Sequence, residues 1–362
     1  MYRCHNELME PVTHFLTGAC LGRSGFNRKT AYATLAMTLA AEAPDLDVFW
    51  GFRGPVAAFE HHRGITHSFL AAPVIALVTT AFVWLVHKLS RKQPVIPPRW
   101  GLIWLFAMIA DLSHLLLDYT NNYGIRPFYP FDAHWYAWNI VFIIEPVILL
   151  ALLGALIMPW LLGLADSEIG ARRKLFRGRG WAISALICMA LVWAVRNAEH
   201  AHAIAVFRSA DVTREAAIRV EAEPYPINPF LWRVMAETSD YYQTATVRTL
   251  SDQVQTDGLE DIVDKPPVTL ATFAAKRSWL GRVYLDWSKW PLVVDRGTQA
   301  PNDLPSLPPG ASAVSFEDLR FAYSPVSASS HPEQQPPLSG WVYVGAQREI
   351  EGMFMGKKEQ KP

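Results

Sequence analysis

Three ionisable side chains lie within the otherwise apolar stretch Trp100–Asp118. Asp111, His114 and Asp118 are spaced by three and four residues, so a helix would place them on one stripe. Burying carboxylates and an imidazole in an apolar helix is costly unless they face a partner, a metal ion or water. The stripe is therefore a candidate functional site, although a hydrogen-bonded cluster that joins two helices would show the same pattern.

More imidazole, carboxyl and guanidinium groups precede this stretch. They are His14, Asp45, Asp47, His62, Arg63 and His67. A single histidine such as His14 on an apolar helix is more often a core residue than a ligand, and Asp45 and Asp47 could simply cap a helix. Arg63 could hold an anionic oxygen through a charge-assisted pair.

Imidazoles and carboxylates without thiolates suit a catalytic zinc or manganese site, with one ion or two. Because His114 and Asp118 are four residues apart, both can reach one ion from successive helical turns. Asp111 could be a further ligand or a group that fixes an imidazole tautomer. Such a site lowers the pKa of bound water and polarises a carbonyl or phosphoryl oxygen.

The composition indicates a membrane part combined with a soluble part. The 362 residues are 51% hydrophobic and 18% charged, which is more apolar than an ordinary soluble protein. The formal net charge of +0 argues against nucleic acid as a specific partner. The three widely separated cysteines predict neither a disulfide framework nor a thiolate metal site.

Length and hydropathy predict a mainly α multi-pass transmembrane bundle over residues 1–200. The long apolar spans are Phe69–His87, Trp100–Asp118, Asn139–Gly163 and Trp181–Ala198. Glu10–Leu21 is expected to form a short amphipathic or half-inserted helix, and Thr30–Ala43 a helix packed inside the bundle. Glu145 would lie about one and a half turns into the third span.

Basic loops orient these spans, because cytoplasmic loops of membrane proteins collect Lys and Arg. Loops 88–99 and 164–180 are rich in Lys and Arg and are expected in the cytoplasm. Residues 119–138 and everything after residue 200 then lie outside. By the same alternation all the candidate ligands gather near the outer face, and Glu145 with them.

A β-rich extracytoplasmic domain is expected over residues 201–362. The predicted strands are Thr244–Leu250, Val283–Asp286, Leu292–Asp295, Phe316–Tyr323 and Trp341–Ala346. The segment Pro325–Ser339 reads as a loop, and the tail after Gly356 is expected to be disordered.

Four motifs in the first half of the chain resemble the membrane-bound metal-dependent hydrolases of the YdjM-like group. They are Thr13–Gly18 (THFLTG), Pro44–Asp47 (PDLD), His62–Ser68 (HRGITHS) and His114–Asp118 (HLLLD) followed by Thr120, Gly124 and Pro130-Phe131. A more distant similarity is to zinc-dependent phospholipases C and single-strand nucleases. One departure is Glu145-Pro146, where the family is expected to carry Asp-Pro.

The resemblance implies a helical enzyme of the bacterial inner membrane that uses a divalent metal, zinc or manganese, to hydrolyse a phosphoester or lipid-derived substrate. In the hypothesis that we favour, the hydrolysis takes place at the outer membrane face and the metal ligands are His14, Asp45, His62, His67, His114 and Asp118. Asp47 or Glu145 would support a ligand or act as base, and Arg63 would bind substrate. Membrane lipids are the expected surroundings and source of substrate.

Two other readings remain open. In a proton-coupled or ion transporter, Asp111, His114 and Glu145 would form a path through the membrane. Charged groups should then recur deep within several spans, whereas here they gather near one end. In a structural membrane protein, a metal ion would only pin helices while the C-terminal part binds a partner.

Overall fold

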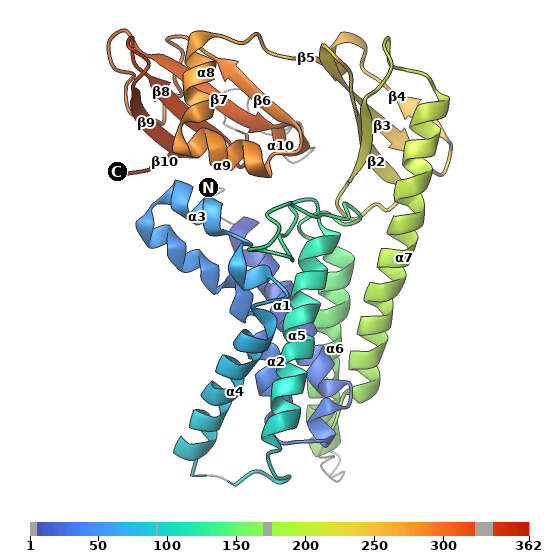
Figure 1. The fold of residues 1–362 in the computed structure, drawn as a ribbon. Coiled ribbons are helices and arrows are strands. Elements are labelled where there is room, and N and C mark those ends of the chain that lie inside the picture. Colours follow the sequence, from blue (N-terminus) through green and yellow to red (C-terminus); the bar gives the residue numbers. More distant parts are fainter. Residues whose placement is uncertain (1–5, 92, 169–175, 323–335, 362) are drawn as a thin grey trace.

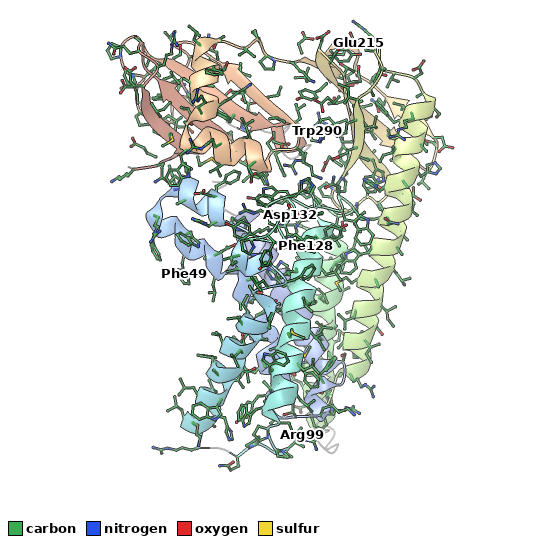
Figure 2. The ribbon with its side chains drawn as sticks, in the orientation of Figure 1. Phe49, Arg99, Phe128, Asp132, Glu215 and Trp290 are labelled. Atoms are coloured by element: carbon green, nitrogen blue, oxygen red, sulfur yellow. The ribbon has the colours of Figure 1, made fainter. Side chains whose placement is uncertain are left out.

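The computed structural model describes residues 6–91, 93–168, 176–322 and 336–361. A helical bundle forms one half of the molecule, and two antiparallel sheets lie at one of its ends (Figure 1). This confirms the predicted fold class, a mainly helical membrane bundle followed by a β-rich C-terminal part. Arg99, at the start of one long helix, lies at the opposite end of the molecule from Glu215 and Trp290, which lie beside the sheets (Figure 2).

Four helices in the described residues are long and apolar enough to cross a bilayer. They are α4 (Ala72–Leu89), α5 (Trp100–Thr120), α6 (Pro146–Glu168) and α7 (Arg179–Ser209). The third begins later than expected, at Pro146, because proline favours the first turn of a helix. Glu145 therefore precedes α6 instead of lying one and a half turns inside it.

Two shorter helices, α1 (Asn6–Arg23) and α2 (Ala33–Ala40), pack against each other and against the long helices. Gly18 and Gly22 make the contact between α1 and α2 close. A Cβ atom on Gly18 would lie 2.5 Å from the Met37 carbonyl oxygen, and one on Gly22 would lie 2.5 Å from Thr34 Cα. Small residues allow such close backbone approach within membrane bundles.

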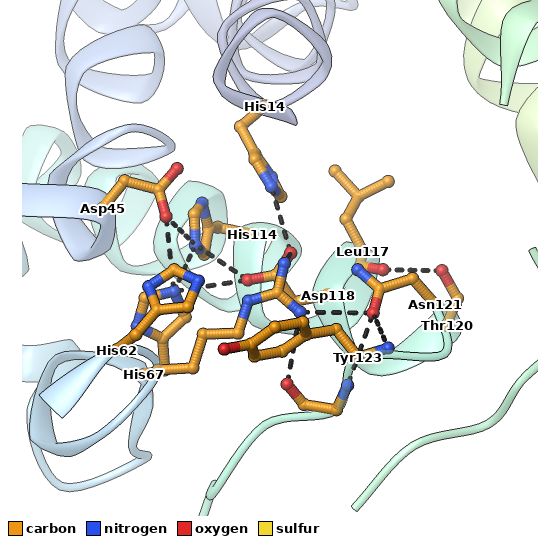
Figure 3. A network of polar contacts seen from close by, with 12 residues as sticks. His14, Asp45, His62, His67, His114, Leu117, Asp118, Thr120, Asn121 and Tyr123 are labelled. Carbon is orange, nitrogen blue, oxygen red and sulfur yellow. Dashed lines mark hydrogen bonds and ion pairs between the residues drawn. The ribbon is translucent and has the colours of Figure 1, made fainter. Parts of the chain in front are cut away.

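Short helical segments cover the end of the bundle that faces the sheets. They are the 3-10 helix η2 (Ala43–Arg53), the α-helix α3 (Pro55–His61) and the 3-10 helix η3 (Ile65–His67). A further 3-10 turn, η1 (Phe26–Arg28), lies between α1 and α2. The segments η2 and η3 carry the PDLD and HRGITHS motifs and bring them toward the C-terminal end of α5 (Figure 3).

The helix α7 connects the bundle to the first sheet. Its 31 residues correspond to about 46 Å, which exceeds the ~30 Å hydrocarbon core of a bilayer. Its last turns, with Ala203 and Phe207, pack against Trp232 of the sheet. The sheet has the order β1-β2-β3-β4, with β5 also paired to β3. Its strands are β1 (Arg219–Pro224), β2 (Leu231–Glu237), β3 (Tyr241–Arg248), β4 (Gln253–Gln255) and β5 (Ile262–Asp264), with η4 (Gly258–Asp261) before β5.

The second sheet has the order β10-β9-β8-β7-β6. Its strands are β6 (Pro291–Asp295), β7 (Ser312–Asp318), β8 (Gly340–Val344), β9 (Ile350–Met355) and β10 (Lys358–Glu359). Helices α8 (Leu270–Arg277) and α9 (Trp279–Trp287) pack against it, and α10 (Leu319–Ala322) follows β7.

A continuous apolar core joins the second sheet to the bundle end. Phe59 of α3 contacts Tyr284 and Trp287 of α9, with ring centroids 5.8 and 5.0 Å apart. The Trp287 indole donates a hydrogen bond to the carbonyl of Tyr123, in the loop after α5. The second sheet is therefore packed onto the segments that carry the candidate site.

Several local expectations for the C-terminal part were wrong. Val283–Asp286 belongs to helix α9, because Leu280, Tyr284 and Trp287 form a buried face at helical spacing. The expected strand Phe316–Tyr323 ends at Asp318, where α10 follows. The tail beyond Gly356 is ordered in strand β10, and Gln360 is buried against residues 53–57.

Most of the expected loop Pro325–Ser339 lies outside the described residues. The predicted division of the chain at residue 200 falls within α7, whose last turns belong to the core of the first sheet. The division of the chain into two domains, residues 1–200 and 201–362, therefore stays a prediction.

Candidate metal centre

Four of the candidate ligands converge between η2, η3 and α5. Asp45, His67, His114 and Asp118 place one ligand atom each within 4.8 Å of all the others (Figure 3). The two histidines and Asp118 are buried, whereas the Asp45 side chain is 22% exposed. The group therefore lies inside the protein with a single partly exposed member.

The orientation of His114 is fixed by the protein backbone. Its Nδ1 lies 2.7 Å from the carbonyl oxygen of Ala41, which can only accept, so Nδ1 carries a proton. Nε2 points the other way, 3.3 Å from Asp118 Oδ2 and 3.6 Å from Asp45 Oδ1. A backbone partner of this kind holds a histidine in the tautomer that presents Nε2 to a metal.

His67 is oriented in the same way by a side chain. Its Nδ1 lies 3.5 Å from Asp47 Oδ2 and 3.1 Å from the Thr66 hydroxyl. Its Nε2 faces the Nε2 of His114 at 3.0 Å. With both Nδ1 atoms engaged elsewhere, two imidazole nitrogens and the carboxylates of Asp45 and Asp118 are directed at one point. This set fits a divalent cation with nitrogen and oxygen ligands.

The carboxylates also have capacity for an ion. Asp118 Oδ2 and Asp45 Oδ2 are buried and accept no hydrogen bond from the described residues. Burial alone would raise the pKa of Asp45, but the neighbouring imidazoles of His114 and His67 outweigh it and hold this pKa well below its ordinary value. Asp45 is therefore a carboxylate at neutral pH, the form that binds a cation.

Asp47 supports the group without belonging to it. Burial alone would raise the pKa of Asp47, but His62, His67 and the backbone amide of Arg63 outweigh this effect. The pKa is therefore lower than that of a free aspartate, and the carboxyl group stays ionised. Its Oδ2 accepts a 2.7 Å hydrogen bond from that amide, and its Oδ1 lies 3.3 Å from His62 Nδ1. The aspartate thus positions both histidines of the HRGITHS motif.

His14 and His62 lie beside the four-residue group. The His14 ring is 3.8 Å from that of His114, and its Nε2 is 3.2 Å from Asp118 Oδ1. His62 contacts Asp47, and its side chain is 33% exposed. Their predicted role as metal ligands stays a prediction.

The guanidinium of Arg63 is buried, and the hydrogen bonds described here join it to other groups of the protein. Nη2 donates a 2.8 Å hydrogen bond to Asp118 Oδ1, and Nη1 donates to Asn121 Oδ1 and the Gly124 carbonyl. The guanidinium also lies over the Tyr123 ring. The expected role of Arg63 in substrate binding stays a prediction, and in this structure its guanidinium orients Asp118. Asn121 and Tyr123 were not singled out, although they directly follow the last turn of α5.

Glu145 contacts a different partner. Its carboxylate lies 2.6 Å from Arg196 Nη2 of α7, and burial raises its pKa although Arg196 opposes this. Glu145, His14 and Asp118 line the same small cavity, so Glu145 lies near the centre without facing its four ligand atoms. Its catalytic role stays a prediction.

Two further ionisable residues lie away from the four ligand atoms. His134 lies on an exposed loop, and Asp111 is buried in α5.

A helical bundle suited to a membrane, with an Asp and His cluster at one end, defines a multi-pass membrane protein with a candidate metal site. The family model described as "YdjM inner membrane protein" matches residues 9–203. The chain therefore belongs to the YdjM inner membrane protein family. That match covers every residue of the candidate centre.

One similar curated protein is "Uncharacterized protein YfhP" of Bacillus subtilis (strain 168), 26% identical over 156 residues. The match covers 41% of this chain and 45% of that protein, so the chain spans less than half the length of this relative. No solved structure matches the chain.

Proposed function

We propose that this protein is a membrane-bound hydrolase that uses a divalent metal ion, zinc or manganese, to cleave a phosphoester at the membrane face beside its two sheets. The observation that carries the proposal is the 3.0 Å approach of His67 Nε2 and His114 Nε2, with both Nδ1 atoms engaged and two carboxylates beside them. A bound ion would supply an activated water and a Lewis acid for the phosphoryl oxygen.

The protein's own groups would then orient and move protons. Asp47 fixes His67 and also holds His62, whose partly exposed imidazole can pass a proton between the site and solvent. Arg63 fixes Asp118 through its Oδ1, so that Oδ2 faces the histidines. In the hydrolysis, the water oxygen bonds to phosphorus, the ester P–O bond breaks, and the leaving oxygen takes up a proton.

The cellular orientation is part of this proposal. The helix ends away from the sheets carry or adjoin the described basic residues Lys88, Arg91, Arg99, Arg177 and Arg179, which favours that end as cytoplasmic and the metal centre as extracytoplasmic. The C-terminal sheets would then lie outside the cytoplasmic membrane.

The test begins with metal analysis of protein purified without chelators. We expect the wild type to hold stoichiometric zinc or manganese, and the double variant His67→Ala/His114→Ala to lose it. His134→Ala, which changes an exposed histidine, is the matched control and should retain the metal. A wild type with no more metal than the double variant would contradict the proposal.

Hydrolysis of phosphomonoesters and phosphodiesters is then compared between the wild type and Asp118→Ala. Loss of turnover with a retained fold supports an enzyme. Loss of the fold together with the metal would indicate an ion that only pins helices.

A further inference from the structure

The 3-10 helix η2 has two faces of opposite chemistry. Asp45 and Asp47 point into the metal centre, whereas large apolar side chains on the same segment point out of the protein. The exposed fractions are 58% for Phe49 and 88% for Phe52, whose rings stack on each other with centroids 5.9 Å apart. The other exposed apolar members are Leu46 and Val48. A protein that left this face in water would expose a large apolar patch.

This apolar face lies at the end of a membrane helix. Figure 2 shows Phe49 on the outer side of the bundle, near the height of Phe128. Phe128 contacts Phe69, which precedes α4 by a few residues. From Phe69 and Leu70, exposed apolar residues continue along α4 with Val74, Leu77 and Val78. Because η2 also packs against α4, its exposed apolar side chains lie beside this apolar strip.

An aromatic and a basic residue on η2 fit the boundary between hydrocarbon and headgroups. The Arg53 guanidinium lies 4.8 Å from the centre of the Trp50 ring. Tryptophan is enriched at this depth of membrane proteins, and arginine can keep its charge among the headgroups while its stem covers apolar surface. These features select a lipid leaflet as the occupant of this face.

The candidate centre is most accessible on the side of η2. Asp45 is its partly exposed member, at 22%, and the neighbouring His62 is 33% exposed, whereas His67, His114 and Asp118 are buried. On another side, Tyr123 beneath Arg63 is covered by Trp287 of α9. The exposed ligand and the lipid-facing aromatic residues are thus only a few residues apart on one short segment.

We infer that η2 lies in the headgroup boundary of the leaflet and that the metal centre takes its substrate from that leaflet, as a lipid phosphoester. This inference rests on the proposed function and names its substrate class. The lipid chains stay beside Phe49 and Phe52 while the phosphate enters the metal centre on the side where Asp45 and His62 are partly exposed. Water's oxygen bonds to phosphorus, the bond from phosphorus to the lipid oxygen breaks, and that oxygen leaves as the lipid alcohol after taking up a proton.

The depth of η2 is measured first, by spin labels in proteoliposomes of phosphatidylethanolamine and phosphatidylglycerol. Single cysteines replace Phe49, Phe52 or, as control, the exposed Leu250 of the first sheet, in a Cys4→Ser/Cys20→Ala/Cys188→Ala background. We expect labels at 49 and 52 to be accessible to oxygen and shielded from a water-soluble nickel chelate, and the label at 250 to show the reverse. Equal nickel accessibility at all three positions, or shielding that needs a second copy of the chain, would overturn the inference.

The substrate route is tested with the metal-loaded full chain. Phe49→Ser/Phe52→Ser is compared with the wild type and with Phe273→Ser, an exposed phenylalanine on α8. The substrates are phosphatidic acid in the same vesicles and the water-soluble p-nitrophenyl phosphate. We expect the double variant to raise KM for the vesicle substrate about tenfold, which corresponds to the partial burial of two aromatic rings, and to leave hydrolysis of the soluble ester unchanged.

The outcomes separate the two proposals. Hydrolysis of the soluble ester without hydrolysis of the vesicle substrate, or without an effect of the double variant, overturns lipid entry and leaves the hydrolase standing. If neither substrate is hydrolysed, both the proposed hydrolase and its lipid substrate are overturned. The spin labels alone then decide the depth of η2.

Discussion

Arg63 Nη2 and Asp118 Oδ1 form a 2.8 Å ion pair between two side chains that are each about 1% exposed. The pair joins the loop before η3 to the last turn of α5, and it occupies only one oxygen of the carboxylate. The other oxygen faces the imidazoles of His67 and His114. Arg63 thereby determines which lone pairs of Asp118 are available to an ion.

Removing this arginine charge should destabilise the protein strongly. Arg63→Gln leaves Asp118 buried with an uncompensated charge, and breaking a buried pair in this way costs about 3–5 kcal/mol. We expect a lower thermal midpoint in detergent, measured by circular dichroism. Arg53→Gln removes an exposed arginine of η2 and should shift the midpoint little. Equal midpoints for the two variants would show that the buried pair does not stabilise the fold.

Replacing Asp111 by an apolar residue should stabilise the protein. It is fully buried in α5, and neither carboxylate oxygen accepts a hydrogen bond from the described residues. Because an unpartnered buried polar group costs about 1–3 kcal/mol, Asp111→Leu should raise the thermal midpoint. Metal content should stay at the wild-type value, whereas Asp118→Leu should lose the metal. A loss of metal from the Asp111 variant would make Asp111 a ligand.

The stability of the β-rich part should depend on pH through Glu223. Burial raises the pKa of this β1 side chain to about 7, against the opposing charges of Arg320 and Lys289. A raised carboxyl pKa means that the folded state keeps a proton that the unfolded state releases. The free energy of unfolding is then highest below about pH 4.5 and falls by about 3 kcal/mol as the pH rises to 7.

Glu223→Gln should abolish this part of the pH dependence, because the amide stays neutral. Thermal midpoints measured from pH 4.5 to 8 should converge with those of the wild type at the acid end and exceed them above pH 7. Glu215→Gln, at an exposed glutamate, should follow the wild type throughout. A wild-type curve parallel to that of Glu223→Gln would contradict the assignment.

Trp287 should hold the second sheet on the bundle. Its ring packs between Phe59, Tyr123 and Phe321, and its indole donates a hydrogen bond to the Tyr123 carbonyl. Trp287→Ala removes these contacts and should cost about 3–5 kcal/mol. The thermal midpoint and limited proteolysis of the loop after α5 measure this loss. Phe273→Ala, on the exposed side of α8, should leave both unchanged.

The candidate ligands were predictable where residue type and spacing were unusual. An imidazole and two carboxylates in an apolar helix, and three histidines beside an arginine, stand out without any structure. The orientation of His114 was not predictable, because its partner is the backbone carbonyl of Ala41, and any residue has one. The pairing of Glu145 with Arg196 depends on how α6 and α7 pack, which a single sequence does not specify.

The long apolar helices were predictable because their length exceeds what chance patterns produce. Short apolar runs were not. Val283–Asp286 fits the alternation of a strand, and only the contacts of Tyr284 and Trp287 with Phe59 show that the run is one turn of α9. The tail pairs with β9 across a short turn, but the burial of Gln360 depends on residues 53–57, about 300 positions earlier in the chain.

The length of α7 links the bilayer to the first sheet. Because a single continuous helix neither stretches nor compresses appreciably, a thinner membrane must tilt α7 and a thicker one must straighten it. Ala203 and Phe207 pack into the sheet, so the sheet follows each such tilt as a rigid attachment. A change in bilayer thickness that alters the tilt of α7 would therefore also move the first sheet.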